Sequence, residues 1–325
     1  MDRKKIFSIS SEEEFKEVSL EVFNFQYSNN LVYRRFCDLL KIIPKQVNEI
    51  SKIPFLPIQF FKSHEILSSK DTIEKTFTSS GTTGMETSKH AVTDLSLYEA
   101  SFTKAFRRFY GDVNNYVVLA LLPSYLEREG SSLIYMANYL IEKSGHPQSG
   151  FYLDNLTELK NTLVALDKAG KKVLLIGVSF ALLDLVESHQ FKLKNTIVME
   201  TGGMKGRRKE MIREELHQIL RKGFGVDQIH SEYGMTELLS QAYSKGGGVF
   251  ECPEWMKILI RDPEDALAYL SPGKTGGINV IDLANLYSCS FIATQDLGKK
   301  HSDGSIEIMG RFDSSDIRGC NLLIL

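Results

Sequence analysis

Glycines, hydroxyl side chains and one lysine are concentrated in the segment from Thr76 to His90, TFTSSGTTGMETSKH. Small residues let backbone N–H groups approach an anion closely, and hydroxyls and an ammonium group add further donors. The segment therefore predicts a loop that binds the phosphates of a nucleotide. The spacing is not that of a P-loop, G-x-x-x-x-G-K-[ST], because Gly81 and Gly84 are three residues apart and Lys89 follows five residues later. The ligands we expect from this loop are Ser79, Ser80, Gly81, Thr82, Thr83, Gly84 and Lys89.

A second group of functional side chains lies in EYGMTE, Glu232 to Glu237, at the end of a predicted strand. Ligand sites of α/β sheets lie at the carboxyl ends of strands. The Thr236 hydroxyl can donate to a phosphate, and Glu237 offers a hard oxygen to a Mg²⁺ ion that bridges phosphates. We therefore expect an ATP-binding segment formed by Tyr233, Gly234, Met235, Thr236 and Glu237.

Two further motifs follow closer to the C-terminus. TQDLG offers Asp296, whose carboxylate can accept hydrogen bonds from both ribose hydroxyls, and GRFDSSD sets Arg311 and Asp313 on a turn after the last predicted strand. Clusters of Ser, Thr, Gly and Asp are also ordinary turns, so each motif alone is a weak signal. Their order along one chain is what favours a nucleotide site.

These motifs in this order resemble the adenylate-forming superfamily of acyl-CoA synthetases and adenylation domains. The matches are TSSGTTG for the phosphate loop, YGMTE for the Mg²⁺ and AMP motif, TQDLG for the ribose-binding aspartate and GRFD for the hinge. The segment ETGGMKGR, with Gly202, Gly203 and Met204, is similar to the glycine turn against adenine in that superfamily. The resemblance runs from about Pro54 onward and implies ATP and Mg²⁺ as cofactors.

The C-terminal part narrows the resemblance. Ordinary members continue after the hinge for roughly a hundred residues, which form a mobile lid with a catalytic lysine. This sequence continues for fourteen residues after Arg311. We therefore expect the fold without the lid domain, with Lys89 or Lys205 as candidate replacements for the lid lysine. The length, together with DIRGCNLLI and FIATQDLG, resembles the acyl-protein synthetase component of bacterial bioluminescence fatty-acid reductase complexes.

That resemblance implies a function. The family activates a fatty acid as its acyl-AMP, transfers the acyl group to its own cysteine near the C-terminus, and delivers it to a partner reductase subunit. Cys320 lies where that acceptor would be, so Thr236, Glu237 and Cys320 are the residues expected to be catalytic. The alternative for Cys320 is a small buried core residue, and for Lys89 and Lys205 it is a solvated surface lysine.

Two other functions fit the same motifs. A ligase that uses coenzyme A, similar to the phenylacetate-CoA ligases, would be active without Cys320. A non-catalytic nucleotide-binding subunit that organises a reductase complex would bind ATP without releasing pyrophosphate. Pyrophosphate exchange with a panel of carboxylic acids, followed by mass spectrometry of the intact protein, separates the three.

Composition argues against several partners. Of the 325 residues, 42% are hydrophobic and 25% are charged, with a formal net charge of −2 and a pI of about 6.4, so no nucleic acid partner is expected. The longest nearly apolar run, Val173 to Leu183, is shorter than the ~18 residues that span a bilayer. The N-terminal residues lead into an acidic run, so we expect no secretory signal and a cytoplasmic protein.

The four cysteines are Cys37, Cys252, Cys289 and Cys320, and they include no C-x-x-C pair. This pattern suits neither a disulfide framework nor a structural zinc site. Cys252, Cys289 and His230 are conceivable metal ligands, but scattered Cys and His residues are more often core residues. No metal cage is predicted.

The elements that must position these residues follow from hydrophobic periodicity. A capping box at Ser10 or Ser11, with Glu13 or Glu14, predicts a helix through Phe15, and more helix is expected over 30–43. Further helices are expected at about 95–110, 131–144, 156–170 and 208–220, alternating with strands at about 116–122, 172–178, 196–203 and 227–234. This alternation predicts a mainly parallel, doubly wound α/β sheet.

The predicted organisation has three parts. A helical N-terminal segment, 1–75, packs on the core, and an α/β nucleotide-binding core follows over 76–245. Short strands between glycine turns over 246–325 predict a small antiparallel β layer with a C-terminal tail.

Overall fold

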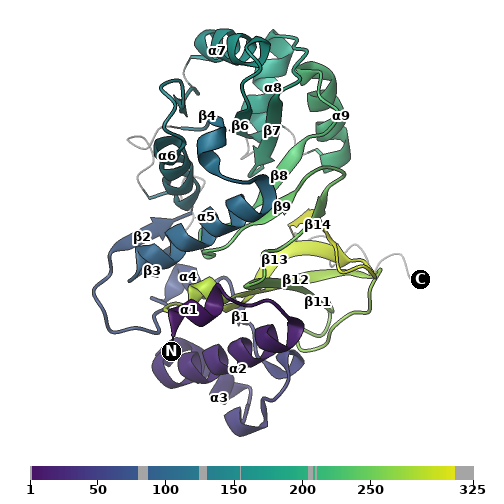
Figure 1. Cartoon of the computed structure of the whole chain (residues 1–325). Helices are drawn as coiled ribbons and strands as arrows, with labels where there is room; N and C mark the ends of the chain where they lie inside the picture. The colour runs from purple at the N-terminus through teal and green to yellow at the C-terminus, as the bar shows by residue number, and fades with distance from the viewer. Residues whose placement is uncertain are drawn as a thin grey trace, which may run out of the picture. The chain divides into compact units, whose positions relative to one another are not determined.

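A computed structural model describes residues 2–79, 87–123, 130–153, 155–203, 208 and 211–311 of the chain. These residues form two compact units (Figure 1). Unit 1 comprises the described residues of Met1–Thr72 and Val249–Leu325, and unit 2 comprises those of Ile73–Gly248. Unit 2 is thus inserted between the two chain segments that build unit 1.

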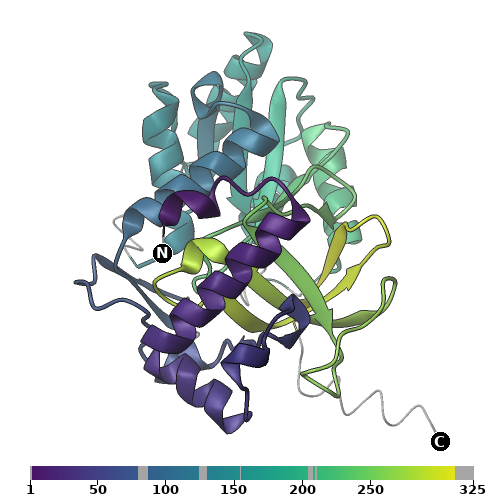
Figure 2. The same cartoon turned by 60° about the horizontal axis from the view of Figure 1, so that its bottom comes forward.

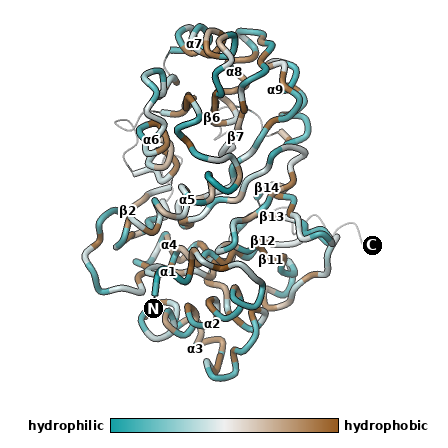
Figure 3. The backbone as a smooth tube through the Cα atoms, viewed as in Figure 1, coloured by the Kyte–Doolittle hydropathy of each residue, from teal (hydrophilic) through white to brown (hydrophobic). Residues whose placement is uncertain are grey.

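A six-stranded sheet with the order β5-β4-β6-β7-β8-β9 forms the centre of unit 2. As predicted, the sheet is mainly parallel, and only β9 runs antiparallel, at the edge beside β8. All residues of β4 and β6 are buried, which their uninterrupted apolar runs explain, and the apolar colour around β6 is visible in Figure 3. The strands are β4 (Val117–Leu121), β5 (Gly150–Phe151), β6 (Val173–Val178), β7 (Thr196–Thr201), β8 (His230–Tyr233) and β9 (Ala242–Ser244).

Helices cover both faces of this sheet. The chain passes from β4 to β5 in one direction and then crosses back to β6, β7 and β8 in the other. Right-handed crossovers therefore place α6 on one face and α7, α8 and α9 on the opposite face, which is the doubly wound arrangement. The helices are α5 (Leu95–Tyr110), α6 (Ser132–Ser144), α7 (Leu156–Lys168), α8 (Ser179–Ser188) and α9 (Arg213–Phe224), and a separate hairpin consists of β2 (Lys75–Thr78) and β3 (Lys89–Val92).

Two helices of unit 2 differ from the sequence prediction. The sequence did not predict α8, because SFALLDLVES is apolar on nearly every side and no side chain caps its start. α9 begins at Arg213 rather than near residue 208. Arg208 instead forms ion pairs with Asp184 and Glu187 of α8, the latter at 2.6 Å between Nη1 and Oε1.

Unit 1 contains the second six-stranded sheet, with the path β10-β14-β13-β12-β11. Its neighbouring strands along this path are antiparallel, as predicted. β1 adds to β13 in parallel, a pairing the sequence did not predict, because Leu56 and its partner Ile292 are far apart in the chain. The strands are β1 (Leu56–Pro57), β10 (Val249–Phe250), β11 (Met256–Arg261), β12 (Thr275–Asp282), β13 (Phe291–Lys300) and β14 (Ile306–Arg311).

The helices of unit 1 pack on this sheet, and Figure 2 shows α2 in front of it. The predicted capping box is confirmed, because Ser11 Oγ accepts from the Glu14 amide at 3.2 Å and Glu14 Oε2 accepts from the Ser10 amide at 2.7 Å. The helix expected over 30–43 ends at Leu39, and Lys41 beyond it has a left-handed φ of 57°. The helices are α1 (Arg3–Ile6), α2 (Glu12–Asn29), α3 (Leu31–Leu39) and α4 (Phe60–Ser63).

Gln26 of α2 joins the two chain segments of unit 1. Its side chain is fully buried, and its amide nitrogen donates to the carbonyl oxygens of Asn285 and Leu286 at 3.0 and 2.9 Å. Its Oε1 accepts from the Ser290 amide at 2.9 Å. The side chain therefore forms hydrogen bonds with backbone carbonyl and amide groups of the turn that precedes β13. Within the described ranges, no helix combines the length and apolarity needed to cross a bilayer.

Candidate active site

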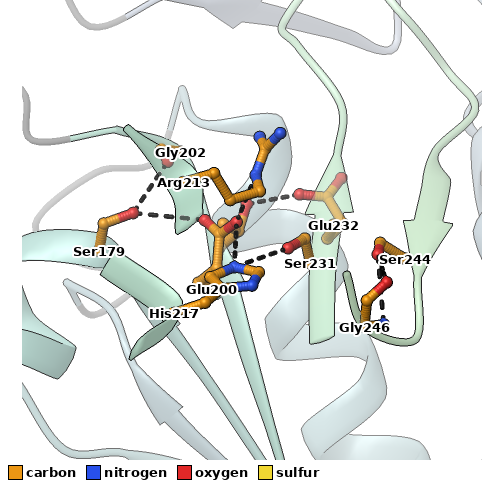
Figure 4. A network of polar contacts seen from close by, with 10 residues as sticks. Ser179, Glu200, Gly202, Arg213, His217, Ser231, Glu232, Ser244 and Gly246 are labelled. Atoms are coloured by element: carbon orange, nitrogen blue, oxygen red, sulfur yellow. Dashed lines mark hydrogen bonds and ion pairs between the residues drawn. The ribbon is translucent and has the colours of Figure 1, made fainter. Parts of the chain in front are cut away.

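The carboxyl end of β7 runs into the predicted glycine turn. β7 ends at Thr201, and Gly202 follows with φ of 65°, a conformation that glycine adopts without strain. Ser179, the first residue of α8, donates its hydroxyl to the Gly202 carbonyl at 3.1 Å (Figure 4). Gly202 and Gly203 are exposed, whereas Met204 and Lys205 lie outside the described residues. Ser179 therefore holds the start of the turn, and the two described glycines are exposed to solvent.

Glu200 lies beneath this turn and joins three elements. Its carboxylate accepts from Ser179 Oγ at 3.3 Å and from Arg213 Nε at 3.2 Å, and His217 Nε2 lies 3.5 Å away (Figure 4). Burial acts to raise the pKa of Glu200, but the hydrogen bond with His217 and the charge of Arg213 outweigh it and hold the pKa below its ordinary value. Glu200 is thus a carboxylate that ties β7 to the starts of α8 and α9.

The side chains of Ser231, His217 and Glu200 lie next to one another, but they do not form a nucleophilic triad. Ser231 Oγ lies 3.4 Å from His217 Nε2, the same ring nitrogen that faces Glu200. In a catalytic triad, one ring nitrogen of the histidine faces the serine and the other ring nitrogen is hydrogen-bonded to the carboxylate. Ser231 is also fully buried. The cluster therefore holds the sheet and helices together.

Glu232 is the second acidic group of this cluster, and it is not among the site residues predicted from the sequence. It is 8% exposed and accepts from Thr201 Oγ1 at 2.5 Å, in the register where Thr201 and Glu232 pair across β7 and β8. Burial raises its pKa to about 7, the Thr201 hydrogen bond opposes this rise, and the charge of Glu200 adds to it. The only signal in the sequence was an acidic residue directly before Tyr233 at the strand end.

The predicted segment after β8 starts beside the glycine turn. Tyr233 ends β8, and a Cβ at Gly234 would lie 2.5 Å from Glu232 Oε1, so only glycine fits without displacing that carboxylate. Met235 and Thr236 are half-buried, the Leu238 amide donates to the Met235 carbonyl, and Glu237 is 5% exposed. The structure therefore brings 201–203 and 233–237 to one edge of the sheet, where open α/β sheets bind ligands.

The hairpin β2–β3 flanks the predicted phosphate loop. Ser79 and Ser88 are bonded at its base, through Ser79 N to Ser88 O at 3.1 Å and Ser88 N to Ser79 Oγ at 2.9 Å. Lys89 on β3 is exposed. Five of the predicted loop ligands, Ser80, Gly81, Thr82, Thr83 and Gly84, lie outside the described residues.

The last two predicted nucleotide ligands belong to unit 1. Asp296 on β13 and Arg311 on β14 are paired in register, with Arg311 Nε 3.8 Å from Asp296 Oδ1. The Asp296 side chain is 13% exposed and the Arg311 side chain 86%. Cys320 and Asp313 lie outside the described residues.

Glu237 is a single buried carboxylate, so a Mg²⁺ ion bound there would need further ligands from a substrate. In the described part of the chain, no group of three His, Cys, Asp or Glu side chains could cage a metal ion. Mg²⁺ keeps several waters and is usually bound by one or two carboxylates together with substrate phosphates. A single buried carboxylate fits that pattern.

Comparison with known proteins identifies proteins to which this chain is similar. Residues 5–114 match the family described as "Acyl-protein synthetase, LuxE". The chain is 24% identical over 332 residues to the long-chain-fatty-acid--luciferin-component ligase of Vibrio harveyi, across 92% of this chain and 84% of that protein. It is 23% identical over 350 residues to the protein of the same name from Aliivibrio fischeri, across 99% and 91%. The chain is thus similar to LuxE acyl-protein synthetases over residues 5–114 and to these two ligases over most of its length.

Solved structures show the fold of the LuxE-like chain. ATP-bound MatB from Rhodopseudomonas palustris matches with a TM-score of 0.56 and 19% identity, across 75% of this chain and 49% of that one. A 2-hydroxyisobutyryl-CoA ligase in the postadenylation state, in complex with 2-HIB-AMP, matches with a TM-score of 0.67 and 12% identity, across 93% and 68%. The chain thus shares the α/β fold of these two enzymes, and the match spans about half the length of MatB.

Proposed function

We propose that this LuxE-like chain uses ATP to activate a long-chain fatty acid as acyl-AMP, and then carries the acyl group on Cys320 to a partner reductase. The observation that carries the proposal is the edge where β7 and β8 end together, in a glycine turn and in the segment Tyr233 to Glu237. The names of the bacterial relatives support the fatty acid as substrate.

In the proposed first step, a carboxylate oxygen of the fatty acid attacks the α-phosphorus of ATP. The bond from that phosphorus to the oxygen bridging the β-phosphate breaks, and pyrophosphate leaves with the electron pair. Thr236, Lys89 and the loop donors from Ser79 to Gly84 stabilise the charge on the phosphates. Glu237 would hold Mg²⁺, which neutralises part of the charge on the leaving pyrophosphate.

The nucleoside part of ATP has its own proposed ligands. Adenine would bind against Tyr233 and the turn of Gly202, Gly203 and Met204. Asp296 would accept hydrogen bonds from the ribose hydroxyls, and Arg311 would lie beside it. Glu200 and Ser179 would support this site indirectly, because Ser179 donates to the Gly202 carbonyl at the start of the turn and to the Glu200 carboxylate.

The described cysteines are poor acyl acceptors, which supports Cys320. Cys37 and Cys289 are fully buried, and Cys252 is partly exposed. Burial raises the pKa of each of these three thiols to about 12. At pH 7.5 a thiol of this pKa is ionised to an extent on the order of 10⁻⁵ to 10⁻⁴, against roughly a tenth for an ordinary cysteine.

In the proposed second step, the Cys320 thiolate attacks the acyl carbonyl carbon of acyl-AMP. The bond from that carbon to the phosphate oxygen breaks, AMP leaves, and a thioester remains on the protein. The partner reductase would then take the acyl group from this thioester.

Exchange of labelled pyrophosphate into ATP, measured with a panel of carboxylic acids, tests the first step. We expect exchange with long-chain fatty acids in the presence of Mg²⁺. Nucleotide binding without exchange for any acid would contradict adenylation and favour a non-catalytic subunit.

Mass spectrometry of the intact protein after reaction tests the second step. Cys320→Ser should keep the exchange reaction and lose a hydroxylamine-labile acyl adduct, whereas the control Cys252→Ser should keep both. An adduct that persists in Cys320→Ser would contradict the assignment of the acceptor. Because one structural relative is named as a CoA ligase, the same reaction is run with coenzyme A. Formation of acyl-CoA by Cys320→Ser at the wild-type rate would favour the ligase alternative.

A further inference from the structure

His90 connects the strand that leaves the predicted phosphate loop to the interior of unit 2. It lies on β3 next to the exposed Lys89 and is itself 0% exposed. Across the hairpin it pairs with Phe77 of β2, which is also fully buried. The hydrogen bonds between Ser79 and Ser88 lie two residues earlier and close the described base of the hairpin on which His90 lies.

The His90 ring contacts the backbone of the segment after β8. Its Nδ1 lies 2.8 Å from the carbonyl oxygen of Thr236. A carbonyl oxygen only accepts hydrogen bonds, so Nδ1 must carry the proton and donate it. This carbonyl belongs to the peptide group that also contains the Glu237 nitrogen, and that group is planar. The hydrogen bond therefore fixes the orientation of the peptide that connects Thr236 to Glu237.

We propose that His90 is a positioning residue that holds the Thr236–Glu237 peptide in the orientation needed to bind Mg²⁺ and the ATP phosphates. The inference rests on the proposed function, and it adds a residue for which neither the glycine-rich loop nor the YGMTE motif gives a role. His90 would act through Thr236 and Glu237, without touching the ligand.

Three substitutions separate this role from simple packing. His90→Asn keeps an N–H donor near the position of Nδ1, His90→Gln moves the donor one methylene further out, and His90→Leu removes it at similar volume. We expect His90→Asn to stay within about threefold of wild type in kcat/KM for Mg²⁺-ATP in pyrophosphate exchange. His90→Gln and His90→Leu should lose a factor on the order of 10 to 100, with little change in the KM for the fatty acid.

A half-buried histidine elsewhere in unit 2 serves as a comparison. His146 also places a ring nitrogen, Nε2, 3.2 Å from a backbone carbonyl, that of Asn114. His146→Leu removes an analogous contact and should leave the KM for Mg²⁺-ATP unchanged. Equal losses in the His146 and His90 variants, or a His90→Asn variant as poor as His90→Leu, would overturn the proposal. Equal losses for ATP and fatty acid in the His90 variants would overturn it as well.

Binding measurements keep this test independent of the proposed reaction. Equilibrium dialysis of Mg²⁺-ATP and of AMP should show weaker Mg²⁺-ATP binding in His90→Leu, with AMP binding within about twofold of wild type. If wild type catalyses no exchange with any acid, the proposed function fails while this binding comparison still decides the role of His90. Unchanged Mg²⁺-ATP binding in His90→Leu would refute that role.

Discussion

Glu232→Gln tests the physical account of the cluster below the glycine turn. Glu232 is buried, with one hydroxyl donor from Thr201 and the charged Glu200 nearby. Burial is the main reason that its pKa rises from the ordinary 4.5 to about 7. Glutamine has the same shape, can still accept from Thr201 and cannot ionise.

Proton linkage determines whether the unfolding free energy rises or falls with pH. Between pH 4.5 and 7 the folded protein holds a proton on Glu232 that the unfolded chain has lost, so stability falls as pH rises through this window. The contribution of this bound proton to the free energy of unfolding is fully present below about pH 4.5 and is lost above about pH 7. A pKa change of this size corresponds to roughly 3 kcal/mol, which is an upper value. As pH rises from 5 to 8, the unfolding free energy of Glu232→Gln should therefore increase by about 1–3 kcal/mol relative to that of wild type.

Urea unfolding at a series of pH values measures this gain. Far-UV circular dichroism is the suitable probe, because the only tryptophan, Trp255, belongs to unit 1 and Glu232 to unit 2. Glu187→Gln is the control with the opposite sign, since the hydrogen bond from Arg208 lowers the Glu187 pKa. If the free energies of wild type and Glu232→Gln change in parallel with pH, Glu232 ionises normally and the account of its burial is wrong.

Three further changes test other parts of the molecule. Glu237→Gln should lower pyrophosphate exchange by a factor on the order of 10² at saturating Mg²⁺ with the fold intact, and unchanged exchange would remove Glu237 from the site. Thr82→Ala should weaken ATP turnover more than AMP binding, because AMP lacks the β- and γ-phosphates; equal losses would place the loop elsewhere. Gln26→Leu should cost about 2–4 kcal/mol in urea unfolding followed by Trp255 fluorescence, since it leaves buried backbone groups of unit 1 unsatisfied; an unchanged midpoint would contradict this.

Local signals explain which parts of the fold the sequence could predict. The predicted bounds of α5 match the structure because the signals are in the chain itself: Asp94 caps the Ser96 amide and Gly111 ends the helix with φ of 85°. α8 was missed because a helix buried on most sides has no polar stripe to reveal its period. The parallel pairing of β1 with β13 depends on residues far apart in the chain, and no local pattern encodes it.

The candidate site also contains residues that the sequence could predict and residues that it could not. Tyr233 to Glu237 and the glycine turn were predicted from residue type, and β7 and β8 place them side by side. The supporting contacts of Glu200 and His90 could not be predicted, because their partners lie on other elements and become neighbours only in the folded chain. Assignment of ligands to Ser80–Gly84 and of the acyl acceptor to Cys320 remains a prediction of the sequence.

The insertion of unit 2 into unit 1 has a consequence for synthesis on the ribosome. Gln26 is made 259 residues before its partner Asn285. At roughly 5–20 residues per second, that interval is about 13–50 s. Bringing together the ends of about 175 intervening residues as a flexible chain costs roughly 4–5 kcal/mol. Prior folding of unit 2 would reduce this cost, so unit 2 should fold first, and the apolar faces of the N-terminal helices should stay exposed until β13 has been synthesised.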